Sequence, residues 1–243
     1  MKTNMLIPMA GDGKRFRDVG YDTIKPLIDV CGKPMIQRVI ENLEHPDLNF
    51  IFIIRKDHNE TYGIGEVLMS LFSEGHTIVV QDGLMDGPVA SCLLAKEEID
   101  SSVPLVIANA DQIVEDWDFK EFERHCHGSV SDGVVGVFDS LSSKNSYIKL
   151  NHRGWGVKLA EKKVISTHAT NGIHWWKHGS FFVESAEAMI AAGDRVNGEF
   201  YVAPSYNKMI ELGAKITAYE FEKHFPIGIP EDLQTYKERL NNV

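Results

Sequence analysis

Apolar runs rich in β-branched residues recur along the first half of the chain, and a helix-like segment separates each run from the next. This alternation is typical of the strands and helices of a wound α/β sheet. The predicted strands are Met5–Met9, Phe50–Ile54, Thr77–Val80, Leu105–Ala108 and Val134–Phe138.

The clearest helix signal starts at Pro34, a residue suited to the first helical position. The apolar residues that follow, from Met35 to Leu43, repeat with helical spacing and predict a helix that buries one face. Further helices are predicted at His58–Phe72, Pro88–Ile99, Phe119–His127, Ser180–Ala191, Ala203–Leu212 and Glu231–Leu240.

The pattern changes between about Gly133 and Ser185 to short strand-like pieces separated by Gly, Asn and Ser. The pieces are Tyr147–Leu150, Val157–Ala160 and Gly172–Trp176. We interpret this part as a mixed-sheet half that caps the wound half. Because no low-complexity linker or internal repeat marks a boundary, residues 1–243 are predicted to form one domain, with halves of about 1–132 and 133–243.

Charge narrows the choice of partners. The 243 residues carry 25 Lys and Arg against 35 Asp and Glu, a net charge of −10 that repels polyanions. Nucleic acid is therefore not expected as a partner, whereas a small anion needs only a few convergent cations and backbone N–H groups. The three scattered cysteines predict reduced thiols in a cytoplasmic protein, and no apolar run reaches the length of a signal or membrane-spanning segment.

The most informative segment follows the first predicted strand. Gly11 and Gly13 let the backbone approach a phosphate closely, and Lys14, Arg15 and Lys25 supply positive charge. Two known phosphate motifs fail here, because Phe16 replaces the third glycine of the dinucleotide fingerprint and the P-loop's Gly-Lys-Ser/Thr is missing. From these residues alone, a phosphate cradle and an ordinary glycine-rich turn both remain open.

Asp111 ends a predicted strand, where α/β sheets place ligands, and a carboxylate there suits Mg²⁺. The alternative interpretation is an aspartate that caps the next helix. The histidines around Cys126 and around Trp175 and Trp176 do not complete a four-ligand zinc set at recognised spacing. On a strand, the two tryptophans are expected to place one ring in the core and one on the surface.

Several motifs in a fixed order resemble the sugar-phosphate nucleotidyltransferase superfamily. The resemblance is to short members that include capsule-type and phosphocholine cytidylyltransferases. It implies a Rossmann-like, three-layer α/β/α fold with a mixed central sheet, of the GT-A-like type. The motifs are Ile7–Phe16, Lys25–Ile28, Gly32–Ile36, Gln81–Pro88, Asn109–Asp111, Glu161–Lys162, Asn171–Ile173, Gly198–Tyr201 and Ile227–Leu233.

The resemblance implies transfer of NMP from an NTP to a small phosphorylated metabolite, with release of pyrophosphate. The implied catalytic residues are Arg15, Lys25 and Asp111, and Asp111 would also hold Mg²⁺, the expected cofactor. The residues implied to bind the nucleotide, in the first half, are Met9, Ala10, Gly11, Gly13, Lys14, Arg15, Lys25, Gln81 and Gly87. Those implied to bind the acceptor, in the second half, are Glu161, Lys162, Asn171, Glu199 and Tyr201.

The implied nucleotide is a pyrimidine NTP, with CTP slightly ahead of UTP and dTTP. One departure concerns the metal, because many relatives have a second aspartate where this chain has Pro226. Glu231 and Asp232 are the candidates to replace it.

Other interpretations stay open at this stage. Glu161 and Lys162 also fit a surface pair, Glu199 a helix cap, and Gln81 a turn residue facing solvent. A glycosyltransferase and a non-catalytic nucleotide-binding regulator are the alternative functions. The quaternary structure is left open, with a homodimer as the named candidate.

Overall fold

The computed structural model describes residues 2–72, 76–128 and 130–242. Its strands are β1 (Thr3–Pro8), β2 (Leu48–Arg55), β3 (His76–Gln81), β4 (Leu105–Ala108), β5 (Gln112–Val114), β6 (Gly133–Asp139), β7 (Tyr147–Leu150), β8 (Gly156–Ala160), β9 (His168–Trp176), β10 (Ile216–Glu220) and β11 (His224–Pro226). Its α-helices are α1 (Lys14–Arg17), α2 (Met35–Leu43), α3 (Lys56–Tyr62), α4 (Ile64–Leu71), α5 (Pro88–Cys92), α6 (Lys96–Ile99), α7 (Phe119–Gly128), α8 (Gly179–Ala192), α9 (Val202–Glu211) and α10 (Pro230–Asn241). Two short 3₁₀ helices are η1 (Lys25–Leu27) and η2 (Leu93–Ala95).

The central sheet is mixed, as predicted. Its order is β10-β6-β9-β4-β1-β2-β3, and β7 and β8 continue it beside β9. Strands β3, β2, β1 and β4 run parallel, whereas β9 pairs antiparallel with both β4 and β6. In the central sheet, the wound half and the capping half therefore meet where β9 pairs with β4, and the separate β5–β11 pair also links the two halves.

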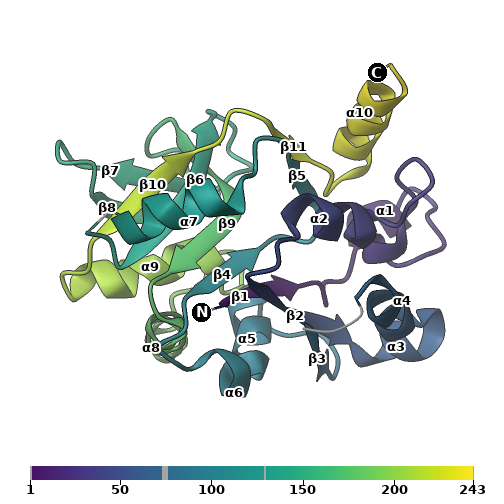
Figure 1. The fold of residues 1–243 in the computed structure, drawn as a ribbon, viewed down its shortest axis with the longest axis horizontal. Helices are drawn as coiled ribbons and strands as arrows, with labels where there is room; N and C mark the ends of the chain where they lie inside the picture. Colours follow the sequence, from purple (N-terminus) through teal and green to yellow (C-terminus); the bar gives the residue numbers. More distant parts are fainter. Residues whose placement is uncertain (1, 73–75, 129, 243) are drawn as a thin grey trace.

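Helices cover both faces of the sheet (Figure 1). The buried side chains of α2, α4, α7 and α10 pack in one apolar cluster, and those of α5, α8 and α9 pack in the other. The C-terminal helix α10 returns to the N-terminal half, where Cys31 Sγ lies 4.0 Å from the carbonyl oxygen of Lys237. The predicted three-layer α/β/α class is confirmed.

The helix predicted after Pro34 is confirmed as α2, and all five of its predicted apolar residues are buried. The single helix predicted over His58–Phe72 is wrong. The helix is interrupted at Gly63, whose φ of 64° lies in the left-handed region that ends a helix. The next helix, α4, starts at the following residue. The helix predicted over Pro88–Ile99 is likewise divided into α5, η2 and α6.

The expectation for the two tryptophans is also wrong, because Trp175 and Trp176 are both buried. Strand β9 lies inside the sheet, and at its C-terminal end helices cover both faces, so both tryptophan rings are shielded from solvent. Trp175 packs in the cluster with α7, and Trp176 stacks on Tyr206 of α9, with ring centroids 4.4 Å apart.

Candidate active site

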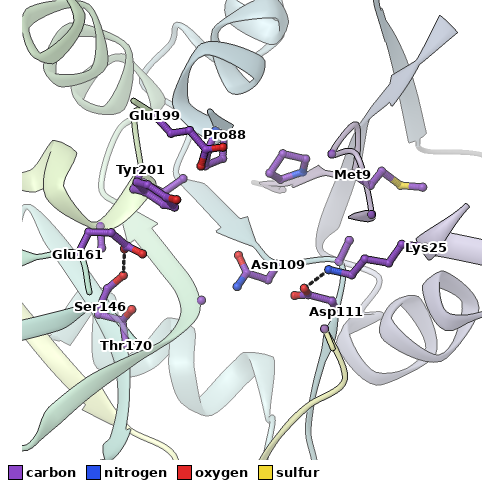
Figure 2. A pocket seen from close by; sticks show the side chains of 18 of the residues that line it. Met9, Lys25, Pro88, Asn109, Asp111, Ser146, Glu161, Thr170, Glu199 and Tyr201 are labelled. Carbon is purple, nitrogen blue, oxygen red and sulfur yellow. Dashed lines mark hydrogen bonds and ion pairs between the residues drawn. The ribbon is translucent and has the colours of Figure 1, made fainter. Parts of the chain in front are cut away.

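A cavity of about 570 Å³ opens where β1 and β4 end and β7 and β9 approach them (Figure 2). The carboxyl ends of parallel strands are where such sheets bind ligands. Residues predicted to bind the nucleotide, the metal and the acceptor meet in its lining: Met9, Gly11, Gly13, Lys14, Arg15, Lys25, Asp111, Glu161, Glu199 and Tyr201.

The other predicted residues do not line this cavity, and one of them, Gln81, lies at the end of β3 with its side chain bonded to Gly83. Ala10 is buried between two lining residues, and Lys162 reaches the site through Tyr201. Gly87 packs against the backbone of Phe200 so closely that a Cβ atom there would lie 2.6 Å from the Phe200 nitrogen. Asn171 is buried, and its Oδ1 accepts a hydrogen bond of 3.0 Å from the Ile173 N–H.

The glycine-rich loop passes directly from β1 to the short helix α1. Gly13 has a φ of 63°, in the left-handed region, and a Cβ atom there would lie 3.3 Å from the Lys25 Cβ. A side chain at this position would strain the backbone and crowd Lys25. The glycine therefore lets the loop that carries Lys14 and Arg15 lie against η1, which carries Lys25.

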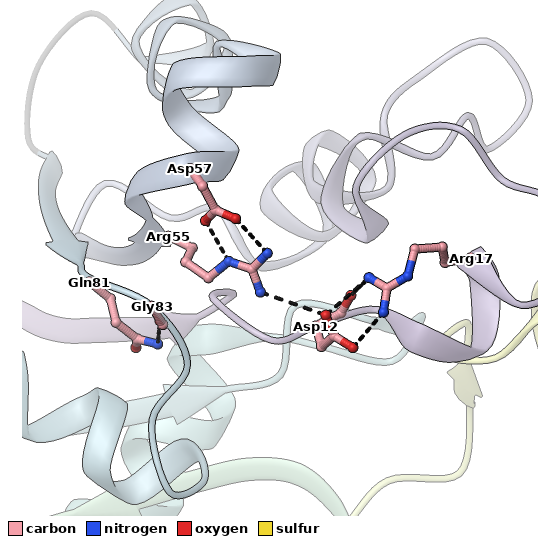
Figure 3. A network of polar contacts seen from close by, with 6 residues as sticks. All are labelled: Asp12, Arg17, Arg55, Asp57, Gln81 and Gly83. Carbon is pink, nitrogen blue, oxygen red and sulfur yellow. Dashed lines mark hydrogen bonds and ion pairs between the residues drawn. The ribbon is translucent and has the colours of Figure 1, made fainter.

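A network of ion pairs anchors this loop to the rest of the sheet (Figure 3). Asp12 accepts two side-chain hydrogen bonds from Arg17, of 2.7 and 3.0 Å, and its carboxylate also lies 3.8 Å from Arg55 at the end of β2. Arg55 in turn pairs with Asp57 at 2.5 Å. The hydrogen bond from Arg17 holds the pKa of Asp12 below its usual value, so this acid stays ionised within the loop.

Asp111 and Lys25 form an ion pair inside the cavity, although 86 residues separate them (Figure 2). Strand β5 follows Asp111, so the alternative in which Asp111 caps a following helix is excluded. The C-terminal motif passes beside this pair: the Ile227 N–H donates a 2.9 Å hydrogen bond to the Asp111 carbonyl oxygen. At Gly228, a Cβ atom would overlap the Asp111 carboxylate.

The residues at Asp111 fit a hard cation that arrives with its own oxygen ligands. Within the described ranges, no three His, Cys, Asp or Glu side chains gather in a way that could hold a metal ion. Pro226 pairs with Gln112 in the β11–β5 ladder and offers no side-chain ligand. Burial is the main cause of the raised pKa of Asp232. The negative charge of Asp111 also raises it, which places Asp232 near Asp111. One carboxylate with phosphate oxygens and water suits Mg²⁺.

The acceptor side is built from β8, β7 and the segment before α9. Glu161 has a side chain only 7% exposed and accepts a hydrogen bond from Ser146, so the pair Glu161–Lys162 is not a solvated surface pair. Burial raises the pKa of Glu161. The Lys162 Nζ donates to the Tyr201 hydroxyl at 2.6 Å. Glu199 does not cap α9, since no side chain caps that helix.

The sequence interpretation missed six polar residues of the lining, one of which is Asn145 in the loop before β7. Lys144 and Ser146 precede β7, Asn109 precedes Asp111, and Thr170 and His174 lie on β9. Asn109 is part of the motif Asn109–Asp111, but no periodicity or motif spacing in the sequence indicated that the other residues belong to the site. Burial lowers the pKa of His174 to about 3, so its imidazole is neutral at neutral pH.

Residues 5–146 match the MobA-like NTP transferase domain, which is more than half of the chain. This chain belongs to the MobA-like NTP transferase family. This match confirms the predicted nucleotidyltransferase superfamily. It also confirms the predicted enzyme class, because the family is one of NTP transferases. The glycine-rich loop, Lys25 and Asp111 all lie within the matched residues of this NTP transferase domain.

Individual relatives are more distant. The bifunctional protein GlmU of Methanocaldococcus jannaschii is 30% identical over 174 residues, which cover 66% of this chain and 40% of the relative. The chain spans about half the length of the curated relatives that it matches.

Two solved structures show the same fold. A nucleoside-diphosphate-sugar pyrophosphorylase from Vibrio cholerae RC9 has a TM-score of 0.82 and 23% identity, with 96% of this chain and 99% of that chain covered. The inositol-1-phosphate CTP transferase of T. maritima has a TM-score of 0.76 and 14% identity, with 97% and 94% covered.

Gly228→Ala tests the contact between the C-terminal motif and Asp111 in this NTP transferase domain. The added methyl group must displace the carboxylate, so we expect NTP-dependent turnover to fall by about 10- to 100-fold, since small misplacements at a reacting centre have effects of this size. Pyrophosphate release measures the loss. Gly128→Ala, where a Cβ atom meets nothing within 4 Å, is the matched control. A fully active Gly228→Ala enzyme would contradict a catalytic position for Asp111.

Proposed function

We propose that this chain transfers NMP from an NTP to a small phosphorylated metabolite and releases pyrophosphate. The observation that supports this most directly is a single cavity in which Lys14, Arg15, Lys25 and Asp111 face Glu161 and Tyr201 from the other half of the chain. The first half, about residues 1–132, would hold the NTP. The second half, about residues 133–243, would hold the acceptor, and the two would act as one domain.

The reaction joins two anions, so charge repulsion is its first obstacle. A phosphate oxygen of the acceptor attacks the α-phosphorus, the bond from that phosphorus to the bridging oxygen breaks, and pyrophosphate leaves with the electron pair. At about 4 Å and an effective dielectric of 20, each pair of like unit charges repels by ~4 kcal/mol. The cations of the glycine-rich loop and η1 offset this repulsion, and the side chains otherwise only position the reactants.

Mg²⁺ is the proposed cofactor, bound through the Asp111 carboxylate and the phosphates. When bound, the ion would neutralise charge on the phosphates between which the bond breaks. Lys25 pairs with the same carboxylate, and we propose that its ammonium turns to a phosphate oxygen when the ion binds. Asp232, at the start of α10, is the proposed candidate for a second acid, because the charge of Asp111 acts on its carboxyl.

We propose a pyrimidine NTP as the nucleotide, with CTP slightly ahead of UTP and dTTP. Gln81 ends β3 and is 1% exposed, so the alternative of a solvent-facing turn residue does not hold. Its Nε2 donates to the Gly83 carbonyl oxygen at 2.8 Å, and its Oε1 is buried without a hydrogen-bond partner. A free buried acceptor suits the 4-amino group of cytosine or N3–H of uracil and thymine.

The named relatives do not decide the base. One solved neighbour is a CTP transferase, another is a pyrophosphorylase complexed with UDP-glucose, and a third, HddC from Yersinia pseudotuberculosis, was solved in complex with GMP-PN. The proposed pyrimidine therefore rests on Gln81, and the preference for CTP within that class rests only on the resemblance to short cytidylyltransferases. That resemblance also supports a role in capsule or surface polysaccharide synthesis, in the cytoplasm. No helix of the described residues is long and apolar enough to span a membrane.

A pyrophosphate-release screen that crosses four NTPs with a panel of phosphorylated metabolites tests this function. Sugar phosphates, polyol phosphates, phosphocholine and phosphorylated amino-acid derivatives make up the panel. We expect release only when both an NTP and one class of acceptor are present. Transfer from a nucleotide-diphosphate sugar without pyrophosphate release would instead indicate a glycosyltransferase. Nucleotide binding without either reaction would indicate a regulator.

Gln81→Ala tests the base assignment. We expect discrimination between CTP and its competitors to fall by ~1–3 kcal/mol, and overall turnover to fall less, because the variant loses a buried hydrogen-bond acceptor for the base. The ratio of kcat/KM for CTP to that for each other NTP measures the change. Gln234→Ala, on the exposed face of α10, is the control. An equal rise in KM for all four NTPs would show that Gln81 only holds the loop through Gly83.

A further inference from the structure

Lys144 is a cation of the cavity that has no role yet in the proposed function. Lys144 lines the cavity from the loop between β6 and β7. Among the residues that the structure describes, none forms a hydrogen bond or ion pair with its ammonium group. The other lysine on this side, Lys162, lies outside the lining and has its ammonium engaged.

The contacts of Lys162 tie it to its neighbours. Its Nζ lies 2.6 Å from the Tyr201 hydroxyl, 4.5 Å from the centre of that ring, and 4.0 Å from the Glu161 carboxylate. Glu161 is itself buried and bonded to Ser146. Moving Lys162 to a phosphate would leave a buried carboxylate with a weaker set of partners, which costs free energy. The contacts of Lys162 therefore indicate a residue that positions Tyr201 and Glu161.

The loop that carries Lys144 is held firmly against the acceptor side. The carbonyl oxygen of Asn145 accepts a hydrogen bond of 3.0 Å from the Lys162 N–H, and that of Ser146 accepts one of 2.8 Å from the Thr170 N–H. Within the loop, the Asn145 side chain donates to Ser140 at 3.0 Å. The backbone beside Lys144 is thus anchored to both β8 and β9, and the anchoring limits where its side chain can reach.

Lys144 and Arg15 come from different halves of the chain. Arg15 lies in α1, behind the glycine-rich loop, and Lys144 lies in the loop before β7. Both cations line the same cavity. Under the proposed function the two reacting phosphates meet in this cavity, so the two cations can act on them from opposite halves of the chain.

We propose that Lys144 binds the phosphate of the acceptor at the junction with the NTP, as a phosphate-contacting residue additional to the predicted set. This proposal rests on the proposed function. Lys144 would offset the charge of the attacking phosphate while Arg15 and Lys25 offset that of the triphosphate. The ligand class is a phosphomonoester, and the ammonium group of Lys144 would contact its terminal oxygens.

Steady-state kinetics of three variants test the proposal. Lys144→Gln should raise the KM of the acceptor by about 10- to 100-fold and leave the KM of the NTP within about twofold, since it removes one cation from the acceptor's phosphate. Lys144→Arg should recover a large part of the loss because it restores the charge. Lys163→Gln, on the exposed neighbour of Lys162, is the control. A rise in the KM of the NTP instead, or no change in either, would overturn the proposal.

A binding measurement separates this proposal from the proposed function. Inorganic phosphate is titrated calorimetrically into protein that is already saturated with Mg²⁺ and pyrophosphate, so that the triphosphate side is filled. We expect Lys144→Gln to weaken phosphate binding by at least about fivefold relative to wild type and to Lys163→Gln. Equal affinity in all three proteins, or no phosphate binding by wild type, would overturn the role of Lys144 whether or not any nucleotidyl transfer is detected.

Discussion

Asp111→Asn is expected to abolish Mg²⁺-dependent turnover, with a fall in kcat of about 10³-fold or more, because the variant removes the carboxylate that pairs with Lys25 in the cavity and is proposed to hold the ion. The amide keeps the shape of the side chain but loses its charge, and neutral amides bind Mg²⁺ weakly. Pyrophosphate release at increasing Mg²⁺ concentration measures the effect.

The same variant should retain nearly all of its thermal stability in the absence of nucleotide. The side chains of Asp111 and Lys25 are 27% and 24% exposed, so water screens their interaction and the loss should stay near the ~0–1 kcal/mol that is usual for such pairs. Asp139→Asn at the exposed end of β6 is a matched control. An Asp111→Asn enzyme with normal Mg²⁺-dependent activity would be strong evidence against the metal assignment.

Arg15→Ala and Lys25→Ala are each expected to lower kcat/KM by ~10²–10³, which corresponds to ~3–4 kcal/mol of lost transition-state stabilisation. Both side chains line the cavity beside the glycine-rich loop, where charge develops as pyrophosphate leaves. The loss should appear in the kinetics with the NTP varied and the acceptor saturating. Lys56→Ala, at the exposed start of α3, provides the control.

Lys25 and Asp111 form an ion pair, so their two substitutions are not expected to act independently on turnover. Because the two side chains contact each other, the double variant Lys25→Ala, Asp111→Asn should lose less than the sum of the two single losses. Purely additive losses would indicate that the two residues act independently. Near-normal turnover in Arg15→Ala or Lys25→Ala would show that the triphosphate lies elsewhere.

Local sequence patterns predicted the elements that carry strong periodicity. Helix α2 has an uninterrupted apolar stripe, and β1, β2 and β4 are continuous apolar runs, so each signals its own conformation without reference to the rest of the chain. The breaks were harder to predict. Gly63 ends one helix and precedes another, and a single glycine within a helical pattern does not by itself distinguish a break from a tolerated residue.

The short strands β5, β10 and β11 escaped prediction for a related reason. Strands β5 and β11 have three residues each and pair only with each other, across more than 100 residues of chain. Strand β10 is an edge strand whose place follows from parallel pairing with β6. The three-residue segments β5 and β11 carry too little periodicity to be recognised, because their conformation is imposed by the partner strand.

For the site, the sequence by itself determined the glycine-rich loop, its cations and the strand-end aspartate, because these lie next to elements with clear local signals. Only the tertiary structure decided which residues come together: Lys25 with Asp111, Gly228 against the same carboxylate, and Lys144 in one cavity with Arg15. The order β6-β9-β4-β1 of the sheet creates these contacts. The side-chain periods of strands and helices encode which face of an element is buried, but they do not encode which distant segment will cover it.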